Sequence, residues 1–372
     1  MSDPFAPLTF LRGPAMKNRF MLAPLTNQQS HPDGTLSDAE CAWLVKRAQG
    51  GFGLTMTCAT CVHPSGQGFP GQLGIWSDHH LPALARLAAA IRQAGSLSAV
   101  QLQHSGWRAP AELTGRQPAG PFEHAETGSR AMTTAEVEEA VESFIAAAIR
   151  AERAGFDGVE LHAAHSYLIC QFLDATNQRD DGWGGAFANR RRFLDTVIAG
   201  IRERTGPHFQ LGVRLSPERH GIPTGEAREL AESLMLSGVV DYVDMSMWDC
   251  FKTPVDPAYA ARPLIEWFTD LPRGGCRLGV AGRIMDAATV RRCLESGADF
   301  VLLGRAAILH HDFPQRMAAD PDFAAVSTPV SRDYLRAEAL SDPFIDYLGR
   351  WDGFVAPSAV ALDANAPEGA GR

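Results

Sequence analysis

The sequence lacks the features that mark nucleic-acid-binding, secreted and membrane proteins. Its 372 residues carry a formal net charge of -9 and no block of Lys and Arg, which argues against a nucleic-acid partner. No apolar run approaches the ~18 residues that a membrane span needs, and the N-terminus, Met1-Ser2-Asp3-Pro4, has no basic stretch followed by an apolar one. We therefore expect a cytoplasmic protein with neither a membrane nor a nucleic-acid partner.

Cysteine is scarce and scattered. The seven cysteines are an odd number spread along the whole chain, so we expect no disulfide framework. Cys58 and Cys61 form a CxxC pair, but no second Cys or His pair follows at zinc-ligand spacing. The pair also ends a predicted strand, whereas redox CxxC motifs open a helix. We therefore predict structural cysteines and no metal site.

Two fold signatures are missing as well. There is no internal repeat of the kind that builds a solenoid, and Pro24-Leu25-Thr26-Asn27 follows the first predicted strand in place of the glycine fingerprint of an open, doubly wound sheet. The chain instead alternates short apolar strands with amphipathic helices, which predicts a parallel α/β protein. The eight predicted strands cover residues 19–23, 53–57, 97–103, 157–161, 209–215, 242–246, 277–280 and 300–303.

Eight such units in order predict a (β/α)8 TIM barrel. Residues 5–17 precede the first strand and are expected to form an N-terminal cap. The connections after the third and fourth strands, residues 105–130 and 174–187, are too long for simple loops, so we expect functional excursions there. Residues 1–356 are predicted to form a single domain, and residues 357–372, rich in Ala, Gly, Asn, Pro and Glu, a disordered tail.

The stretch Gly158–Ile169 carries the strongest functional signal. It begins as a strand, and the alternation of side chains puts Glu160 and His162 on one face. In a closed barrel His162 then points inward at the carboxyl end of its strand, where barrels build active sites. His165 and Tyr167 follow within a few residues. Either histidine alone could be a core or surface residue, but the trio at one strand end favours a functional site.

The ends of the other strands supply the remaining candidates. Gly282-Arg283 and Gly304-Arg305 follow the seventh and eighth strands, where barrels commonly bind phosphate through backbone N–H groups and an arginine. The two arginines could be solvated surface residues, but the same Gly-Arg pair at both expected places favours an anion site. With Gln101 and Arg214 along the barrel floor and the histidine pair above, such a site indicates a phosphorylated aromatic cofactor.

Several motifs, spread over residues 19–353, resemble the old yellow enzyme family of FMN-dependent ene-reductases. The His-His pair resembles the thermophilic-like branch of that family, which usually has a cysteine where this chain has Thr26 and a tyrosine where it has Gln28. The motifs are Ala23-Pro24-Leu25-Thr26, Gln101-Leu102-Gln103-His104-Ser105-Gly106, the segment from Glu160 to Leu168 followed by Gln171-Phe172-Leu173, Asn177, Arg179-Asp180, Val213-Arg214 and Leu303-Gly304-Arg305.

The resemblance implies roles for individual residues. His162 and His165 are implied to hydrogen-bond the electron-withdrawing oxygen of the substrate, and Tyr167 to protonate its α-carbon. Gln28, Trp248 and Arg350 are further candidates for substrate contacts, with Arg350 in a segment that resembles one reaching into a neighbouring subunit of a homo-oligomer. Contacts with FMN are implied for Ala23, Pro24, Leu25, Thr26, Ala59, Gln101 and Arg214 at the ring system, and for Gly282, Arg283, Gly304 and Arg305 at the phosphate.

We therefore expect an FMN-dependent oxidoreductase that takes hydride from NADPH or NADH and reduces the activated C=C of α,β-unsaturated carbonyl or nitro compounds. A cationic Arg214 beside the ring system would stabilise the anionic reduced flavin. Two other enzyme classes stay open: an oxidative amine N-demethylase on the same scaffold, and a non-redox barrel that binds a sugar phosphate. Outside enzymes, the alternative is a flavin-binding regulatory protein without turnover.

Overall fold

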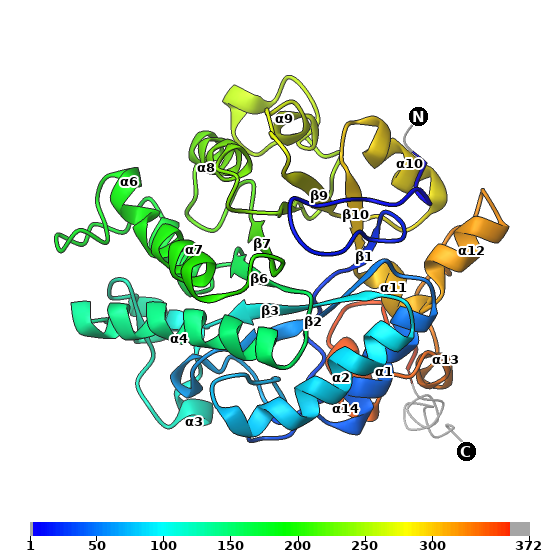
Figure 1. Ribbon diagram of the computed structural model, residues 1–372, viewed down its shortest axis with the longest axis horizontal. Helices are drawn as coiled ribbons and strands as arrows, with labels where there is room; N and C mark the ends of the chain where they lie inside the picture. The colour runs from blue at the N-terminus through cyan, green and yellow to red at the C-terminus, as the bar shows by residue number, and fades with distance from the viewer. Residues whose placement is uncertain (1–2, 358–372) are drawn as a thin grey trace, which may run out of the picture.

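Eight parallel strands close into a barrel at the centre of the molecule, as the sequence predicts. The structure is a computed structural model and describes residues 3–357 (Figure 1). The order around the barrel is β1-β10-β9-β8-β7-β6-β3-β2, with β2 pairing back onto β1. The barrel strands are β1 (Phe20–Leu22), β2 (Leu54–Cys61), β3 (Leu97–Gln103), β6 (Gly158–Ala163), β7 (Gln210–Leu215), β8 (Tyr242–Ser246), β9 (Arg277–Ala281) and β10 (Phe300–Leu303).

Helices surround this barrel, and some of them begin at a side chain that caps them. Ser37 accepts a hydrogen bond from the backbone N–H of Glu40 at the start of α1, and Thr133 forms a capping box with Glu136 at the start of α4. The helices are α1 (Asp38–Gln49), α2 (Leu81–Gln93), α3 (Ala111–Thr114), α4 (Thr134–Arg153), α5 (Leu168–Leu173), α6 (Phe187–Arg190), α7 (Arg192–Arg204), α8 (Thr224–Leu236), α9 (Glu266–Thr269), α10 (Ala287–Glu295), α11 (Arg305–Leu309), α12 (Phe313–Ala319), α13 (Arg332–Ala337) and α14 (Asp342–Leu348). None of the helices within residues 3–357 is long and apolar enough to cross a membrane.

The N-terminal segment closes the amino end of the barrel, as predicted. Leu8 and Met16 pair as an isolated antiparallel bridge and pack with Met21 and Phe300 inside the strands. Gln210, the first residue of β7, donates hydrogen bonds from Nε2 to the carbonyls of Arg12 and Pro14, each at 2.9 Å. Burial of this apolar plug seals one end, so that a ligand can enter the barrel only from the other.

Both long connections contain ordered structure of their own. Residues 105–130 include the 3-10 turn η3 (Gly106–Arg108), α3 and the strand β4 (Ala119–Gly120), which pairs with β5 (Arg130–Ala131). In the second connection, Asn177 donates from Nδ2 to the carbonyls of Phe172 and Trp183, both at 2.9 Å. These bonds satisfy buried backbone groups, as a loop packed against the body of a protein requires.

Three predicted boundaries are wrong in detail. The amino-acid sequence predicts a single helix from Asn189 to Arg204, but the structure has two helices, α6 and α7, with Arg191 between them. The amino-acid sequence also predicts a helix from Asp78 to about Ala94, and this segment begins as a 3-10 turn over Asp78–His80 before α2. The second strand extends to Cys61, and its pairing with β3 shifts register between Met56 and Ala59, so the CxxC pair lies inside the strand. Such shifts follow from tertiary pairing rather than from local sequence.

The C-terminal helices return to the first part of the chain. Phe344 of α14 packs edge-on against Trp43 of α1 with ring centroids 5.5 Å apart, and α13 and α14 lie near α1 and α2 in Figure 1. Ser341, just before α14, donates from its hydroxyl to Oε1 of Gln29 at 2.6 Å, in the loop that follows β1. The predicted disordered tail covers residues 357–372, and residues from 358 onward lie outside the described part of the chain.

Candidate functional site

The register of the barrel places predicted site residues side by side. Ala59 of β2 is the partner of Gln101 of β3, and Gln101 is the partner of Glu160 of β6. Two residues further along the strands, His162 is the partner of Arg214 of β7. Because all the strands are parallel, their carboxyl ends meet at one mouth. The structure therefore brings together strand-end residues that lie far apart in the sequence.

Backbone strain is concentrated at this mouth. A positive φ is costly for residues other than glycine and tends to occur at functional sites. Within residues 3–357, eight such residues have positive φ, and all but Ala339 follow a barrel strand at its carboxyl end. The seven at the mouth are Gln28, His165, Ser166, Arg219, His220, Trp248 and Arg283.

The two histidines bring one ring nitrogen each within hydrogen-bond distance of the other. His162 Nε2 and His165 Nδ1 are 3.3 Å apart, and the two rings are nearly perpendicular. Nδ1 of His162 accepts from the backbone N–H of Ala164, and Nε2 of His165 lies 2.8 Å from Oγ of Ser246. Burial lowers the pKa of both imidazoles well below the usual value, so each is neutral at pH 7 and can donate a single N–H.

Tyr167 stands next to this pair, immediately before α5. Its ring centroid is 4.8 Å from that of His162, with the planes at 76°. Burial raises the pKa of the phenol, while the nearby Arg108 acts in the opposite direction. The phenol thus keeps its proton at neutral pH and is available as an acid. The three residues of the predicted trio share one site.

Beneath the histidines, the barrel floor carries buried charge. Arg214 Nε is 3.1 Å from Oδ2 of Asp244, and Glu160 accepts from Nε2 of Gln101 at 2.8 Å. Burial raises the pKa of both carboxyls, and their mutual repulsion adds to that of Glu160, while Arg214 opposes the rise. Two carboxyls that share one guanidinium in a dry layer retain protons more readily than carboxyls in water do.

The loop after β1 is held in place from behind by a fully buried acid. Oε1 of Glu40 in α1 accepts from Nδ2 of Asn27 at 2.9 Å, and Oε2 accepts from the hydroxyl of Ser30. These bonds anchor Asn27, which follows Thr26, and Ser30, so that they enclose Gln28; Thr26 and Gln28 are both partly exposed. The residues of this loop that are predicted to contact the flavin ring are therefore held in a fixed position.

Two Gly-Arg pairs lie where the sequence predicts a phosphate site. A Cβ on Gly304 would meet no atom closer than Leu25 Cδ2 at 3.5 Å, and Gly304 caps α11, whose first N–H groups lack partners within the helix. Arg305 is exposed and makes no ion pair with any residue in the range 3–357. Arg283 is also largely exposed, with Nη1 3.5 Å from Oδ2 of Asp249. Both guanidiniums are accessible to an anion.

A cavity opens beside His165 on the side of β7 and β8. Trp248 is an exposed large apolar side chain on this wall, at 66%. Arg350, by contrast, is an exposed residue just after α14, and its place in a neighbouring subunit stays a prediction. The cavity is lined by His165, Ser216, Pro217, Glu218, Arg219, His220, Ser246, Met247, Trp248 and Lys252.

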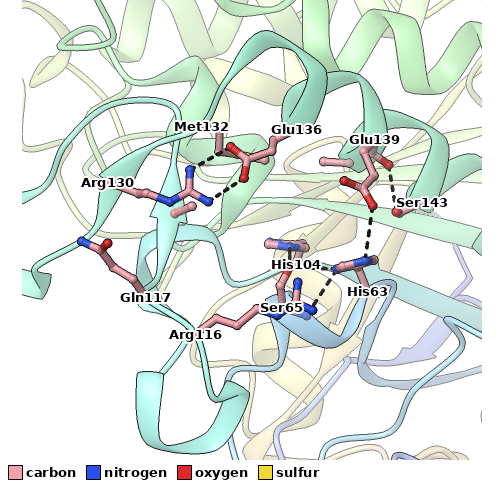
Figure 2. Close-up of a pocket in the computed structure, with 12 residues that line it drawn as sticks. His63, Ser65, His104, Arg116, Gln117, Arg130, Met132, Glu136, Glu139 and Ser143 are labelled. Atoms are coloured by element: carbon pink, nitrogen blue, oxygen red, sulfur yellow. Dashed lines mark hydrogen bonds and ion pairs between the residues drawn. The ribbon is translucent and has the colours of Figure 1, made fainter.

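His104, another strand-end candidate, belongs to a different cavity (Figure 2). It is 5% exposed, its Nδ1 accepts from the N–H of Gly106, and its Nε2 lies 3.2 Å from the hydroxyl of Ser65. Figure 2 shows it stacked near His63, whose Nε2 is 3.8 Å from Glu139 in α4. Burial lowers the pKa of His104 to about 3, so this imidazole is a neutral structural group.

Sequence reasoning missed three polar groups at the mouth. Asp244 and Ser246 alternate with apolar residues along β8, and this period of two could have marked them as inward-facing. Arg108 carries no such signal, because it lies in the long connection after β3. Its Nη1 donates to the carbonyl of His165 at 2.6 Å, and its Cζ is 4.8 Å from the ring centroid of Tyr167.

Comparisons with known proteins identify this architecture. The family model described as NADH:flavin oxidoreductase / NADH oxidase family matches residues 3–321. The "Probable NADH-dependent flavin oxidoreductase YqiG" of Bacillus subtilis is 34% identical over 313 residues, which cover 81% of this chain and 84% of YqiG. An NADPH dehydrogenase of the same organism is 32% identical, covering 88% of this chain and 97% of the relative.

A solved structure agrees with these relatives. The old yellow enzyme homologue from Zymomonas mobilis has a TM-score of 0.75 and 28% identity to this chain, covering 90% of this chain and 96% of the homologue. The barrel fold, the residues at the strand ends and the match to the family model thus agree with one another. The chain belongs to the NADH:flavin oxidoreductase / NADH oxidase family, that of the old yellow enzymes, and is an FMN-dependent NAD(P)H oxidoreductase.

Proposed function

We propose that this protein reduces the activated C=C bond of α,β-unsaturated carbonyl or nitro compounds. The observation that carries the proposal is the convergence of His162 Nε2 and His165 Nδ1, 3.3 Å apart, beside the Tyr167 phenol. His162 carries its proton on Nε2, because its Nδ1 accepts from Ala164. With the proton of His165 on Nδ1, an oxygen atom that lies next to both nitrogens would accept a hydrogen bond from each ring. Its neighbouring carbon atoms then come within reach of the phenol.

FMN fits the residues that surround this point. Asp244 and Ser246 hold the buried guanidinium of Arg214 in the barrel floor, and with its five N–H donors it would also donate to a ring carbonyl or nitrogen of the flavin. Ala23 to Thr26, Ala59 and Gln101 would contact the remaining ring edge, and Gly282, Arg283, Gly304 and Arg305 the phosphate. When bound, FMN supplies the hydride acquired from NAD(P)H to the β-carbon of the substrate.

The histidine pair would polarise the substrate and hold its oxygen atom in a fixed position. Both rings are neutral because burial lowers their pKa, so they stabilise negative charge on the oxygen by hydrogen bonding and keep their protons. A donor of this kind, aimed at developing charge in a site that excludes water, typically contributes ~10²–10³ to the rate. Ser246 supports the arrangement by its contact with His165.

Tyr167 would complete the reduction by giving its proton to the α-carbon. The pKa of the phenol is raised by burial, so the proton stays on oxygen until negative charge develops at carbon. A positioned acid of matched geometry contributes ~10²–10⁴ to a proton transfer. The phenol would therefore act when the substrate is reduced, a step separate from the transfer of hydride by NAD(P)H.

Stopped-flow measurement of the two half-reactions tests this assignment. Tyr167→Phe removes only the hydroxyl group, so reduction by NADPH should proceed at nearly the wild-type rate. Reoxidation by an enone should slow by ~10²–10⁴-fold. Tyr347→Phe in α14 is the matched control, because Tyr347 also faces Tyr167 but has no proposed role. Equal slowing of both half-reactions, or of neither, would refute the proposed acid.

A further inference from the structure

Arg108 lies over the ring of Tyr167, the proposed acid. Its guanidinium carbon lies 4.8 Å from the centroid of the Tyr167 ring, a cation–π contact. The same side chain donates from Nη1 to the backbone carbonyl of His165 at 2.6 Å. Arg108 ends η3, in the connection after β3, so a segment 57 residues away in sequence is fastened to the loop of the histidines.

The groups that face Tyr167 come from four elements and differ in charge. His162 of β6 is in edge contact with the ring, and Cys58 of β2 and Tyr347 of α14 are the other titratable neighbours besides Arg108. Burial keeps His162 neutral, and it raises the pKa of the Cys58 thiol well above the usual value. Among these described neighbours of Tyr167, Arg108 is therefore the one cation at neutral pH.

We propose that Arg108 is a positioning residue that stabilises the tyrosinate formed when Tyr167 protonates the substrate. This inference rests on the proposed function, because it requires Tyr167 to be the acid. In the step itself, the O–H bond of the phenol breaks, a C–H bond forms at the α-carbon, and the electron pair of the O–H bond stays on the phenolate oxygen. The negative charge thus moves from the substrate to a ring that lies under a guanidinium, and a proton from solvent restores the phenol.

The contact between Arg108 and Tyr167 is stronger after the proton transfer, when Tyr167 is a phenolate, than before it. A guanidinium interacts with a neutral phenol through the weak quadrupole of the ring, but with a phenolate through full opposite charges. Arg108 is exposed, and solvent screening reduces the attraction. We therefore expect Arg108→Gln to slow reoxidation by an enone roughly three- to tenfold at pH 7, with reduction by NADPH unchanged.

The pH profile of reoxidation distinguishes this role from simple support of the loop. A cation lowers the pKa of a phenol, so its removal should move the alkaline limb of the profile to higher pH. Arg108→Lys should restore most of the rate and the limb. Arg116→Gln, in the same connection but lining the cavity of Figure 2, is the control and should leave both unchanged.

A double-mutant cycle completes the test. If Arg108 acts through the phenol, Arg108→Gln should have no further effect on reoxidation in a Tyr167→Phe background. An equal loss in both backgrounds would overturn the inference, as would an unmoved alkaline limb or slower reduction by NADPH alone, which would indicate a contact with the dinucleotide. A Tyr167→Phe variant that reoxidises normally would instead refute the proposed function itself.

Discussion

His104→Asn should remove a measurable part of the acid sensitivity of this protein. The imidazole of His104 is buried in the cavity of Figure 2, where Nδ1 accepts from the N–H of Gly106 at 3.0 Å. The side-chain oxygen of asparagine can take that hydrogen bond, but asparagine cannot gain a proton. The variant therefore keeps the hydrogen bond from Gly106, gives up the contact of Nε2 with Ser65, and loses the titration.

The sign and size of the effect follow from linkage. The pKa of His104 is lowered from 6.5 to about 3, chiefly by burial, so the unfolded chain binds a proton in a pH range where the folded protein does not. Stability from this group is complete above pH 6.5 and is lost as the pH falls from 6.5 toward 3. At pH 5.0, 1.5 units below 6.5, the loss is roughly 2 kcal/mol at ~1.36 kcal/mol per unit.

Urea unfolding of the FMN-loaded protein at pH 7.5 and at pH 5.0 measures this loss. The free energy of unfolding should fall by roughly 2 kcal/mol more in the wild type than in His104→Asn. Contributions from His162 and His165 are common to both proteins and cancel in the difference. His31→Asn, at an exposed position, controls for the loss of a histidine at the surface. Parallel pH dependence of wild type and His104→Asn would refute the reasoning.

Two further outcomes are expected. His162→Ala combined with His165→Ala should leave FMN bound but weaken the binding of a phenol ligand by roughly 1 kcal/mol or more per lost hydrogen bond. An unchanged spectroscopic titration with the phenol would contradict the roles of the pair. Arg305→Ala should weaken the binding of FMN to the apoprotein by about tenfold or more, since a charge-assisted hydrogen bond to phosphate is worth ~1.5–3 kcal/mol; an unaltered dissociation constant by fluorescence titration would remove Arg305 from the phosphate site.

Local pattern was sufficient to predict the barrel and its mouth. The eight strands could be recognised because apolar runs of strand length recur between amphipathic helices, and parallel strands joined by helices close in few ways. The spacing of His162, His165 and Tyr167 placed all three after one strand, and the structure confirms that they meet. Period and spacing are local properties, so the amino-acid sequence alone determined these features.

Contacts across the barrel could be decided only by the tertiary structure. The bond between Arg108 and His165 joins positions 57 residues apart, and that between His165 and Ser246 spans 81 residues. Neither pair is marked by any local pattern, because a side chain in a long connection has no period that fixes its direction. The fate of His104 was equally undetermined: its strand end was predicted, but burial against Ser65 made it structural. Burial and partner choice depend on how distant segments pack, and that packing is what turned strand-end residues into a site.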